Sequence, residues 1–174
     1  MILETERLIL RDWRESDASH YMVLSYDVGY NCFSQPSGFL VHTADEAQRK
    51  IQERMTLFAQ RRLGKFPIFL KGTEEFVGTC GLEPFESSGH PEVELGYRLC
   101  LKQWGHGYAA EAATAVLRYG FRDLNLAKII AFAVPQNKAS LKILEKLGFR
   151  YLRDFVHAGL PHRLYEITPS ERFA

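Results

Sequence analysis

The stretch KQWGHGYAAEAA, from Lys102 to Ala113, places two glycines directly before an alanine-rich segment with helical spacing. Glycine lets a ligand approach the main chain closely, and the first N–H groups of a helix have no partner within that helix. A glycine loop followed by a helix is therefore typical of a site that holds phosphate groups. The core of this stretch, GHGYAA, also fits G-x-G-x-x-G/A, the fingerprint of dinucleotide-binding folds. The remaining sequence has to decide which kind of pyrophosphate the loop binds.

A dinucleotide-binding fold makes two demands that the surrounding sequence does not meet. The fingerprint should follow a strand tightly, yet the polar residues 102–104 separate the strand-like segment 92–101 from Gly105. An acidic residue should also lie about 20 positions further on, where it binds the ribose. Twenty residues after Ala110 lies Ile130, and the segment around it ends in Pro, Gln and Asn without a carboxylate. The sequence therefore argues against a NAD-type cofactor.

Composition and charge limit the classes of protein that remain. The 174 residues suit one domain, residues 1–174, and 46% apolar with 25% charged residues is ordinary for a globular protein. With 22 basic and 21 acidic residues the net charge is +1, so a nucleic-acid-binding surface is not expected. The apolar runs stay shorter than the roughly 20 residues that a membrane helix needs. Cys32, Cys80 and Cys100 lack the pair spacing of a metal site, and we expect a cytoplasmic enzyme domain that binds neither metal nor membrane.

Periodicity predicts the order of the secondary-structure elements. In the first half we expect a strand over 5–13, a helix over 17–24 capped by Ser16, a loop over 26–42, a helix from the capping box Thr43–Glu46 to near Gly64, and a hairpin of strands 66–70 and 76–82. In the second half we expect a polar loop over 86–91, strands at 92–101, 127–134, 148–156 and 163–167, and helices over 108–123 and 137–147. A helix that joins two neighbouring strands normally makes them parallel. The pattern thus predicts a mixed α/β domain in which the strands on either side of helix 108–123 are parallel.

Two distant segments resemble the motifs of one known family. Trp104–Ala109, WGHGYA, resembles motif A of the GNAT superfamily of acyl-CoA-dependent N-acetyltransferases, and Asn137–Phe149, NKASLKILEKLGF, resembles its motif B. Glu94–Leu99, ELGYRL, and the opening Glu4–Arg11, ETERLILR, resemble the branch of ribosomal-protein alanine N-acetyltransferases, the Rim-type branch. The resemblance spans nearly the whole chain, in family order. It implies the GNAT fold, a central mixed and mostly antiparallel sheet with a parallel β-α-β core that binds acetyl-CoA as co-substrate, without a metal.

The resemblance also implies which residues contact acetyl-CoA. They belong to the glycine loop, the first turns of the two helices and one strand: Trp104, Gly105, His106, Gly107, Tyr108, Ala109, Asn137, Ser140 and Leu99. Leu99 falls where the family's splayed strand offers its main chain to the pantetheine amides. Trp104 stands where the general pattern has Gln or Arg, so more of the phosphate binding is left to main-chain N–H groups. Each residue also has a structural interpretation: the glycines as turn residues, Trp104 and Tyr108 as core aromatics, and Asn137 as a helix N-cap.

Candidate catalytic residues follow from the chemistry of acetyl transfer, which needs a base for the amine and a proton for the departing thiolate. Glu92 and Glu94 lie two apart, hence on one face of a strand, and Glu94 matches the family's E-[IL]-G-Y position, which makes it the candidate base. Many family members carry a tyrosine acid where this chain has Leu144, so the resemblance leaves Ser140 as the candidate acid. The alternatives are a structural carboxylate for Glu94 and a plain first-turn serine for Ser140. Glu111 is expected to be a structural partner, because a carboxylate would repel bound phosphate.

The acceptor amine is the least determined part of the function. At pH 7 an α-amino group with a pKa near 7.8 is roughly 10–15% neutral, whereas a lysine amine is only about 0.04% neutral. A site with modest base equipment therefore favours the N-terminal α-amine of a protein or peptide. Acetylation of a small amine, such as a polyamine, aminoglycoside or amino acid, and a non-catalytic acyl-CoA-binding module remain alternatives, and the sequence is compatible with a homodimer. Acceptor choice is expected to lie in segments without a motif, namely 26–42, 83–91 and 157–162.

Overall fold

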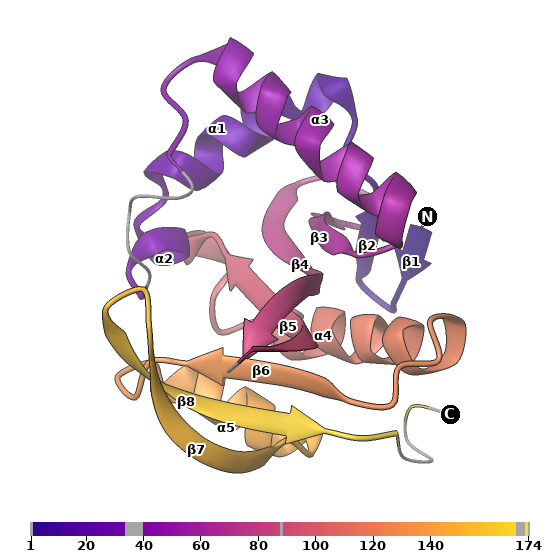
Figure 1. Ribbon diagram of the computed structural model, residues 1–174. Coiled ribbons are helices and arrows are strands. Elements are labelled where there is room, and N and C mark those ends of the chain that lie inside the picture. Colours follow the sequence, from indigo (N-terminus) through magenta and orange to yellow (C-terminus); the bar gives the residue numbers. More distant parts are fainter. Residues whose placement is uncertain (1, 34–39, 88, 170–172, 174) are drawn as a thin grey trace.

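The computed structural model describes residues 2–33, 40–87, 89–169 and 173. In this part of the chain eight strands form one sheet in the order β1-β2-β3-β4-β5-β6-β8-β7 (Figure 1). The strands are β1 (Ile2–Glu4), β2 (Leu8–Arg11), β3 (Gly64–Leu70), β4 (Phe76–Ser87), β5 (His90–Leu99), β6 (Ile129–Ala133), β7 (Arg150–His157) and β8 (Leu160–Ile167). The helices are α1 (Ala18–Tyr26), α2 (Val28–Asn31), α3 (Ala44–Arg61), α4 (Tyr108–Arg118) and α5 (Lys138–Leu147), with a π-helical continuation of α4 over Tyr119–Asp123. Short 3₁₀ turns lie at Glu15–Asp17 and Leu101–Gln103.

The predicted crossover is confirmed, because α4 joins two parallel neighbours, β5 and β6. The other neighbouring strands of the described sheet are antiparallel. β5 and β6 are in register only where Glu94 lies beside Ile130. Beyond that pair the two strands diverge, and the divergence positions the site described below.

Helices cover both faces of the sheet (Figure 1). On one face α4 and α5 bury Val116 and Leu144 in a core cluster that includes Ile68 of β3. On the other face α1 and α3 form a second cluster, in which Ile51 accompanies Phe69 of β3. Ile68 and Phe69 belong to different clusters because successive side chains of a strand point to opposite faces. The mixed α/β architecture expected from the sequence is therefore confirmed.

The strand predicted over 5–13 is confirmed as β2, but it is shorter and forms a hairpin with β1, which the sequence did not predict. β1 and β2 are joined by a turn in which the Thr5 N–H donates to the Leu8 carbonyl at 3.0 Å and the Leu8 N–H donates to Thr5 Oγ1 at 2.9 Å. The predicted Ser16 cap is wrong, because Ser16 lies inside the 3₁₀ turn. Asp17 organises this turn instead, since its carboxylate accepts from the Arg14 N–H at 2.8 Å.

Two segments predicted as loops contain regular structure. The region 26–42 includes α2, and its residues 34–39 lie outside the described part of the chain. The polar segment 86–91 is a close hairpin connection, because β4 continues to Ser87 and β5 begins at His90. The capping prediction for α3 holds: Thr43 Oγ1 accepts from the Glu46 N–H at 3.2 Å.

Candidate active site

Both glycines of the loop before α4 have a left-handed main chain. The φ angle is 79° at Gly105 and 81° at Gly107, a region that residues with a Cβ rarely adopt. Among described atoms, a Cβ at Gly105 would meet none within 4 Å, and one at Gly107 would meet only Arg7, at 3.5 Å. No described side chain caps α4 at Gly107, so the first main-chain N–H groups of the helix are left without a capping partner. The glycines thus keep the helix start open to a ligand.

A cleft of about 430 Å³ lies where β5 and β6 diverge. Its walls are residues 94–99 of β5, residues 131–134 at the end of β6, the loop and first turn of α4, and the start of α5. Both candidate catalytic residues, Glu94 and Ser140, line this cleft. The structure therefore brings the open helix start and the two candidate catalytic residues to one space.

Of the nine predicted contact residues, His106 alone is missing from the described lining of the cleft. Its ring stacks on Tyr108 with centroids 5.4 Å apart, and its carbonyl accepts from Arg7 Nη1 at 3.0 Å. The Arg7 guanidinium also lies 4.7 Å above the Tyr108 ring. His106 is thus placed in a packing contact on the outer side of the loop, between β2 and α4.

The main chain of Leu99 faces the cleft, but its carbonyl already accepts a hydrogen bond. The N–H of the next residue, Cys100, donates to the carbonyl of Val77 in β4 at 3.0 Å, and backbone groups of successive strand residues alternate in direction. The Leu99 groups therefore point away from β4, towards β6. Trp104 Nε1 donates to the Leu99 carbonyl at 3.0 Å, which leaves the Leu99 N–H for a ligand. This hydrogen bond gives Trp104 a role that the sequence did not reveal.

The start of α5 combines a helix cap with a serine inside the cleft. Asn137 Oδ1 accepts from the Ser140 N–H at 3.0 Å, so the N-cap interpretation of Asn137 is confirmed. The Ser140 hydroxyl oxygen lies 2.9 Å from the hydroxyl of Tyr97 on β5. Leu144, one helical turn further on, is buried in the core. Sequence reasoning missed Tyr97, although it occupies the tyrosine of the quoted ELGYRL segment.

A charged network extends from the cleft, which Lys65 and Glu94 line, across three adjacent strands. Glu83 of β4 and Glu94 of β5 are direct cross-strand neighbours, and such pairs of like charge are unfavourable without a cation. Lys65 of β3 supplies that cation, with its Nζ 2.9 Å from Glu83, and Arg54 of α3 binds the same carboxylate. Burial alone would raise the pKa of Glu83, but the charges of Lys65 and Arg54 outweigh it and lower the pKa to about 2. Glu83 is therefore ionised in the folded protein, where it pairs with the two cations and stabilises the fold.

Lys65 reaches this position by extending across β4 onto β5. A Cβ at Gly96 would lie only 2.7 Å from Lys65 Nζ, so the lysine occupies the space that a side chain at position 96 would need. Burial opposes the charge of Lys65, but the nearby carboxylates Glu83 and Glu94 outweigh it and raise the lysine pKa. The glycine of the ELGYRL segment is thus explained by a buried cation from another strand.

Glu94 differs from its neighbouring carboxylates. Glu83 has two cationic partners, and Glu92 pairs with Lys128 at 2.8 Å. For Glu94 no hydrogen bond or ion pair is found within the described residues. It is half-buried and lines the cleft, so its carboxylate is available to an incoming amine.

Glu111 is a structural partner, as its place in the first turn of α4 predicted. Its carboxylate accepts from Thr5 Oγ1 at 2.6 Å and from the main-chain N–H and Nε of Arg7 at 2.9 and 2.8 Å. Burial would raise the pKa of Glu111, but the hydrogen bonds from Thr5 and Arg7 outweigh it and lower the pKa. The carboxylate therefore fastens the β1–β2 hairpin to α4 and faces away from the cleft.

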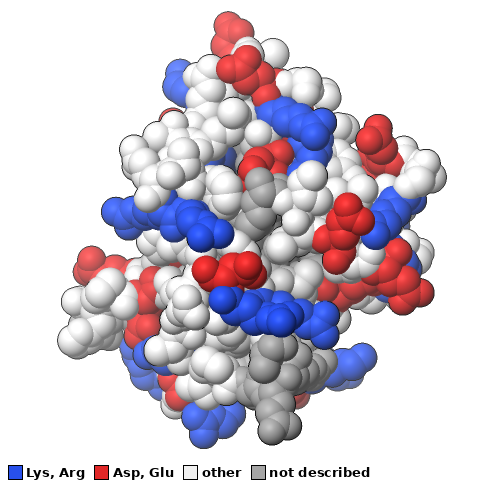
Figure 2. All heavy atoms as spheres, turned by 90° about the vertical axis from the view of Figure 1, so that its right-hand side faces the viewer, with Lys and Arg blue, Asp and Glu red and all other residues white. Residues whose placement is uncertain are grey.

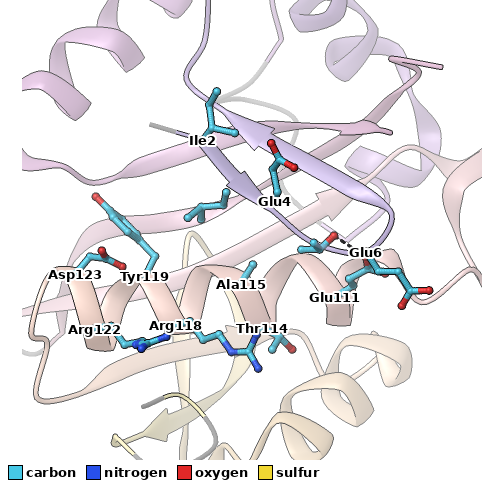
Figure 3. Close-up of a pocket in the computed structure, with 12 residues that line it drawn as sticks. Ile2, Glu4, Glu6, Glu111, Thr114, Ala115, Arg118, Tyr119, Arg122 and Asp123 are labelled. Atoms are coloured by element: carbon cyan, nitrogen blue, oxygen red, sulfur yellow. Dashed lines mark hydrogen bonds between the residues drawn. The ribbon is translucent and has the colours of Figure 1, made fainter. Parts of the chain in front are cut away.

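A second and larger hollow, of about 670 Å³, lies between β1 and the outer side of α4 (Figure 3). Figure 3 shows Glu4 and Glu6 on the hairpin, and Arg118 and Arg122 on the helix, around this hollow. It runs along the flank of α4 rather than at its N-terminal end, so the open N–H groups do not serve it. Its three acidic residues on the hairpin and helix start, Glu4, Glu6 and Glu111, would also repel a pyrophosphate. Size alone would favour this hollow, but the chemistry favours the cleft between β5 and β6.

His162 of β8 lines the far side of the cleft and was not singled out by the sequence. It packs edge-on against Phe132 of β6, with ring centroids 5.3 Å apart, and Nδ1 lies 2.9 Å from the Leu160 carbonyl. Burial lowers the pKa of His162, and the nearby His157 adds to this effect. The aromatic wall continues from Phe132 to His157 and Phe85. The ring centroid of His157 lies 5.2 Å from that of Phe132 and 5.4 Å from that of Phe85. This wall includes part of 157–162, one of the segments in which acceptor choice was expected.

The surface is of mixed charge. On the face shown in Figure 2, acidic and basic side chains intermix over short distances. No helix in the described part of the chain is long and apolar enough to span a membrane. Among the same residues, no group of three or more His, Cys, Asp or Glu side chains is placed to hold a metal ion.

The chain is similar to proteins of one family. A family model described as the acetyltransferase (GNAT) domain matches residues 7–150. The uncharacterized N-acetyltransferase p20 of Bacillus licheniformis is 33% identical over 159 residues, which cover 90% of this chain and 88% of that protein. The ribosomal protein uS5 alanine N-acetyltransferase of Escherichia coli is 31% identical over 94 residues, 52% of this chain and 48% of that protein. RimJ of Mycobacterium smegmatis, solved in complex with CoA-disulfide, has the same fold, with a TM-score of 0.80 and 22% identity over 95% of this chain and 86% of that one.

Proposed function

Because the chain belongs to the GNAT acetyltransferase family, we propose that it transfers the acetyl group of acetyl-CoA to the N-terminal α-amine of a protein or peptide. The observation that supports this most directly is the cleft between β5 and β6. One continuous space joins the open start of α4 to Glu94, the carboxylate without a described partner.

The donor side of the cleft fits acetyl-CoA. Main-chain N–H groups at the start of α4 suit its pyrophosphate, and Gly105 and Gly107 leave the approach free. The Leu99 N–H, on a strand that has left its parallel neighbour, suits an amide of the pantetheine arm as an added strand would. The structure of RimJ with CoA-disulfide supports a CoA donor for this fold. When bound, acetyl-CoA supplies a thioester whose carbonyl carbon an amine can attack.

The two candidate catalytic residues then have separate tasks in the transfer. Glu94 accepts the proton that the amine loses when its nitrogen bonds to the acetyl carbon. The Ser140 hydroxyl keeps its proton and donates a hydrogen bond to the sulfur, which leaves as a thiolate with the electron pair of the broken carbon–sulfur bond. Both residues line the same cleft, Glu94 from β5 and Ser140 from the first turn of α5.

Two arguments favour an α-amine as acceptor. An α-amino group is far more often neutral at pH 7 than a lysine amine, so a single carboxylate base suffices for it. The relative described as acting on alanine of ribosomal protein uS5 also supports a protein acceptor. The cleft wall around His162 is aromatic, which suits apolar groups next to the amine.

An acceptor panel tests this function. Release of the CoA thiol is followed with a peptide that has a free N-terminus, with the same peptide acetylated at its N-terminus but carrying a lysine, and with a polyamine, an aminoglycoside and an amino acid. We expect turnover with the free N-terminus, and mass spectrometry should locate the acetyl group on the α-amine. Turnover on small amines alone would overturn the peptide acceptor. Tight acetyl-CoA binding without turnover on any acceptor would instead indicate a binding module.

A further inference from the structure

Tyr97 is the one polar side chain that reaches the Ser140 hydroxyl among the described residues, and the proposed function gives it no task. It lies on β5 between Leu95 and Leu99 and packs against the core under α4 and α5. Its hydroxyl is 2.9 Å from Ser140 Oγ and 3.2 Å from the Ser140 carbonyl oxygen. Burial raises the pKa of Tyr97, so the phenol stays protonated and neutral throughout the physiological range.

The single proton of Tyr97 can satisfy only one of these two oxygens at a time. If it goes to the Ser140 carbonyl, the Ser140 hydroxyl must donate to Tyr97, and its own proton is then turned away from the cleft. If it goes to Ser140 Oγ, the Ser140 proton is free to point into the cleft. The shorter of the two distances, 2.9 Å against 3.2 Å, is the one to Oγ.

We propose that Tyr97 is a positioning residue that donates to Ser140 Oγ and thereby directs the Ser140 proton towards the sulfur of the acetyl donor. This rests on the proposed role of Ser140 as the hydrogen-bond donor to that sulfur. No bond to Tyr97 forms or breaks during the transfer, and its proton remains on the phenol oxygen. A negatively charged sulfur strengthens the hydrogen bond that it accepts from Ser140, so the arrangement matters most as the thiolate departs.

The geometry separates this role from a packing role. The Tyr97 ring contributes to the core, and a phenylalanine would keep the ring and its contacts. Only the hydroxyl reaches Ser140. Tyr97→Phe therefore removes the hydrogen bond while the fold and the cleft remain, and Ser140 loses the partner that fixes its side-chain rotamer.

A double-mutant cycle tests the inference. The wild type, Tyr97→Phe, Ser140→Ala and the double variant are compared at saturating acetyl-CoA, with the acceptor that turns over fastest, whatever its class. We expect Tyr97→Phe to lower kcat about five- to tenfold, the equivalent of one ordinary hydrogen bond, and to leave acetyl-CoA affinity within about twofold. In the Ser140→Ala background the same change should have no further effect on kcat, because Tyr97 acts only through that hydroxyl.

Tyr119→Phe is the matched control. Like that of Tyr97, the Tyr119 hydroxyl reaches a main-chain carbonyl, that of Arg62 at 2.8 Å, but Tyr119 is buried and lies outside the cleft. Its kcat should equal that of the wild type, with a similar change in Tm to Tyr97→Phe.

The outcomes separate the two levels of the proposal. An equal loss from Tyr97→Phe in both backgrounds, or wild-type kcat in Tyr97→Phe while Ser140→Ala is slow, overturns the positioning role and leaves the proposed function intact. Wild-type kcat in Ser140→Ala overturns the role of Ser140 and that of Tyr97 with it. Turnover confined to small amines overturns only the peptide acceptor, because the cycle can be run with any amine.

Discussion

The two walls of the cleft present different chemical groups to a ligand. The wall at the start of α4 is main chain: left-handed glycines and the open N–H groups of a helix, all within Trp104–Ala109. The opposite wall carries two ionisable side chains, Lys65 of β3 and Glu94 of β5, and Lys65 pairs with Glu83 of β4, the strand between them. The first wall depends on the absence of side chains, and the second depends on which charges the sheet register brings together. Substitutions should therefore damage the two walls in different ways.

The largest effect is expected where a side chain would enter the main-chain wall. Gly107→Val should weaken acetyl-CoA binding by about 10³-fold or more, because the valine both opposes the left-handed φ and occupies the space before the helix. Calorimetry measures the affinity and thermal unfolding measures the stability. Gly72→Val is the matched control, since Gly72 has a φ of 82° in the β3–β4 turn, with no described atom near its Cβ position. Near-native affinity in a folded Gly107→Val protein would contradict the main-chain site.

Behind the side-chain wall, Glu83 should matter for stability. Glu83→Gln leaves Lys65 and Arg54 without their shared carboxylate in a largely buried position, and we expect the free energy of unfolding to fall by about 3 kcal/mol at pH 7. The pKa of Glu83 is about 2 when folded against an ordinary 4.5, so its stabilisation is present above pH 4.5 and is lost as the pH falls towards 2. Denaturant unfolding at several pH values should show the variant and the wild type converging over that window. Equal stability at pH 7 would show that the pair contributes nothing.

Its cross-strand neighbour Glu94 should matter for catalysis instead. Glu94→Gln should lower kcat/KM by about 10²-fold at pH 7 with little change in stability, because the lost attraction to Lys65 is offset by the lost repulsion from Glu83. The loss should be largest for acceptors of high amine pKa, and it should shrink as the pH rises and the amine deprotonates unaided. pH–rate profiles for two acceptors measure this. A variant with the wild-type profile would show that Glu94 is a structural carboxylate like Glu83.

The smallest effect is expected from Trp104, a side chain that holds the main chain beside the glycine loop. Trp104→Phe removes the hydrogen bond from the indole to the Leu99 carbonyl but keeps an aromatic ring beside the loop. A partly exposed hydrogen bond of this kind corresponds to about fivefold in acetyl-CoA affinity. A loss as large as that of Gly107→Val would mean that the indole, rather than the main chain, carries the binding.

The same contrast explains what the sequence could reveal. The main-chain wall is formed by consecutive residues, so the glycine loop, α4 and the parallel crossover were predictable. The Asn137 cap was predictable for the same reason, because it too depends on residues that are close in the sequence. The charged wall depends on strand register: nothing near Lys65 in the sequence indicates that its side chain crosses β4 to lie over Gly96. A register becomes definite only when the whole sheet is assembled, because a shift by one residue would turn these side chains to the other face.

Errors in the prediction have the same origin. The N-cap at Ser16 was predicted from a local sequence rule. In the structure Asp17 organises this turn instead, and its carboxylate accepts hydrogen bonds from Arg11 at 2.7 and 2.8 Å. Trp104 and Tyr97 were visible as aromatic residues of the motifs, but their hydrogen bonds reach Leu99 and Ser140, which only the folded chain brings near. The contact of His106 with the donor stays a prediction, although this residue is missing from the described lining of the cleft.

The lysine that lies across the sheet also constrains how this chain can evolve. A side chain at position 96 collides with the far end of Lys65, whereas one at position 81 collides with the main chain of Gly64 and Lys65. Position 96 therefore becomes open to larger residues once the end of Lys65 moves aside or position 65 holds something shorter, while position 81 stays closed in either case. Two glycines that look equivalent in the sequence are thus subject to different constraints. Substitution of Gly96 depends on the side chain at position 65, whereas substitution of Gly81 is blocked by the backbone itself.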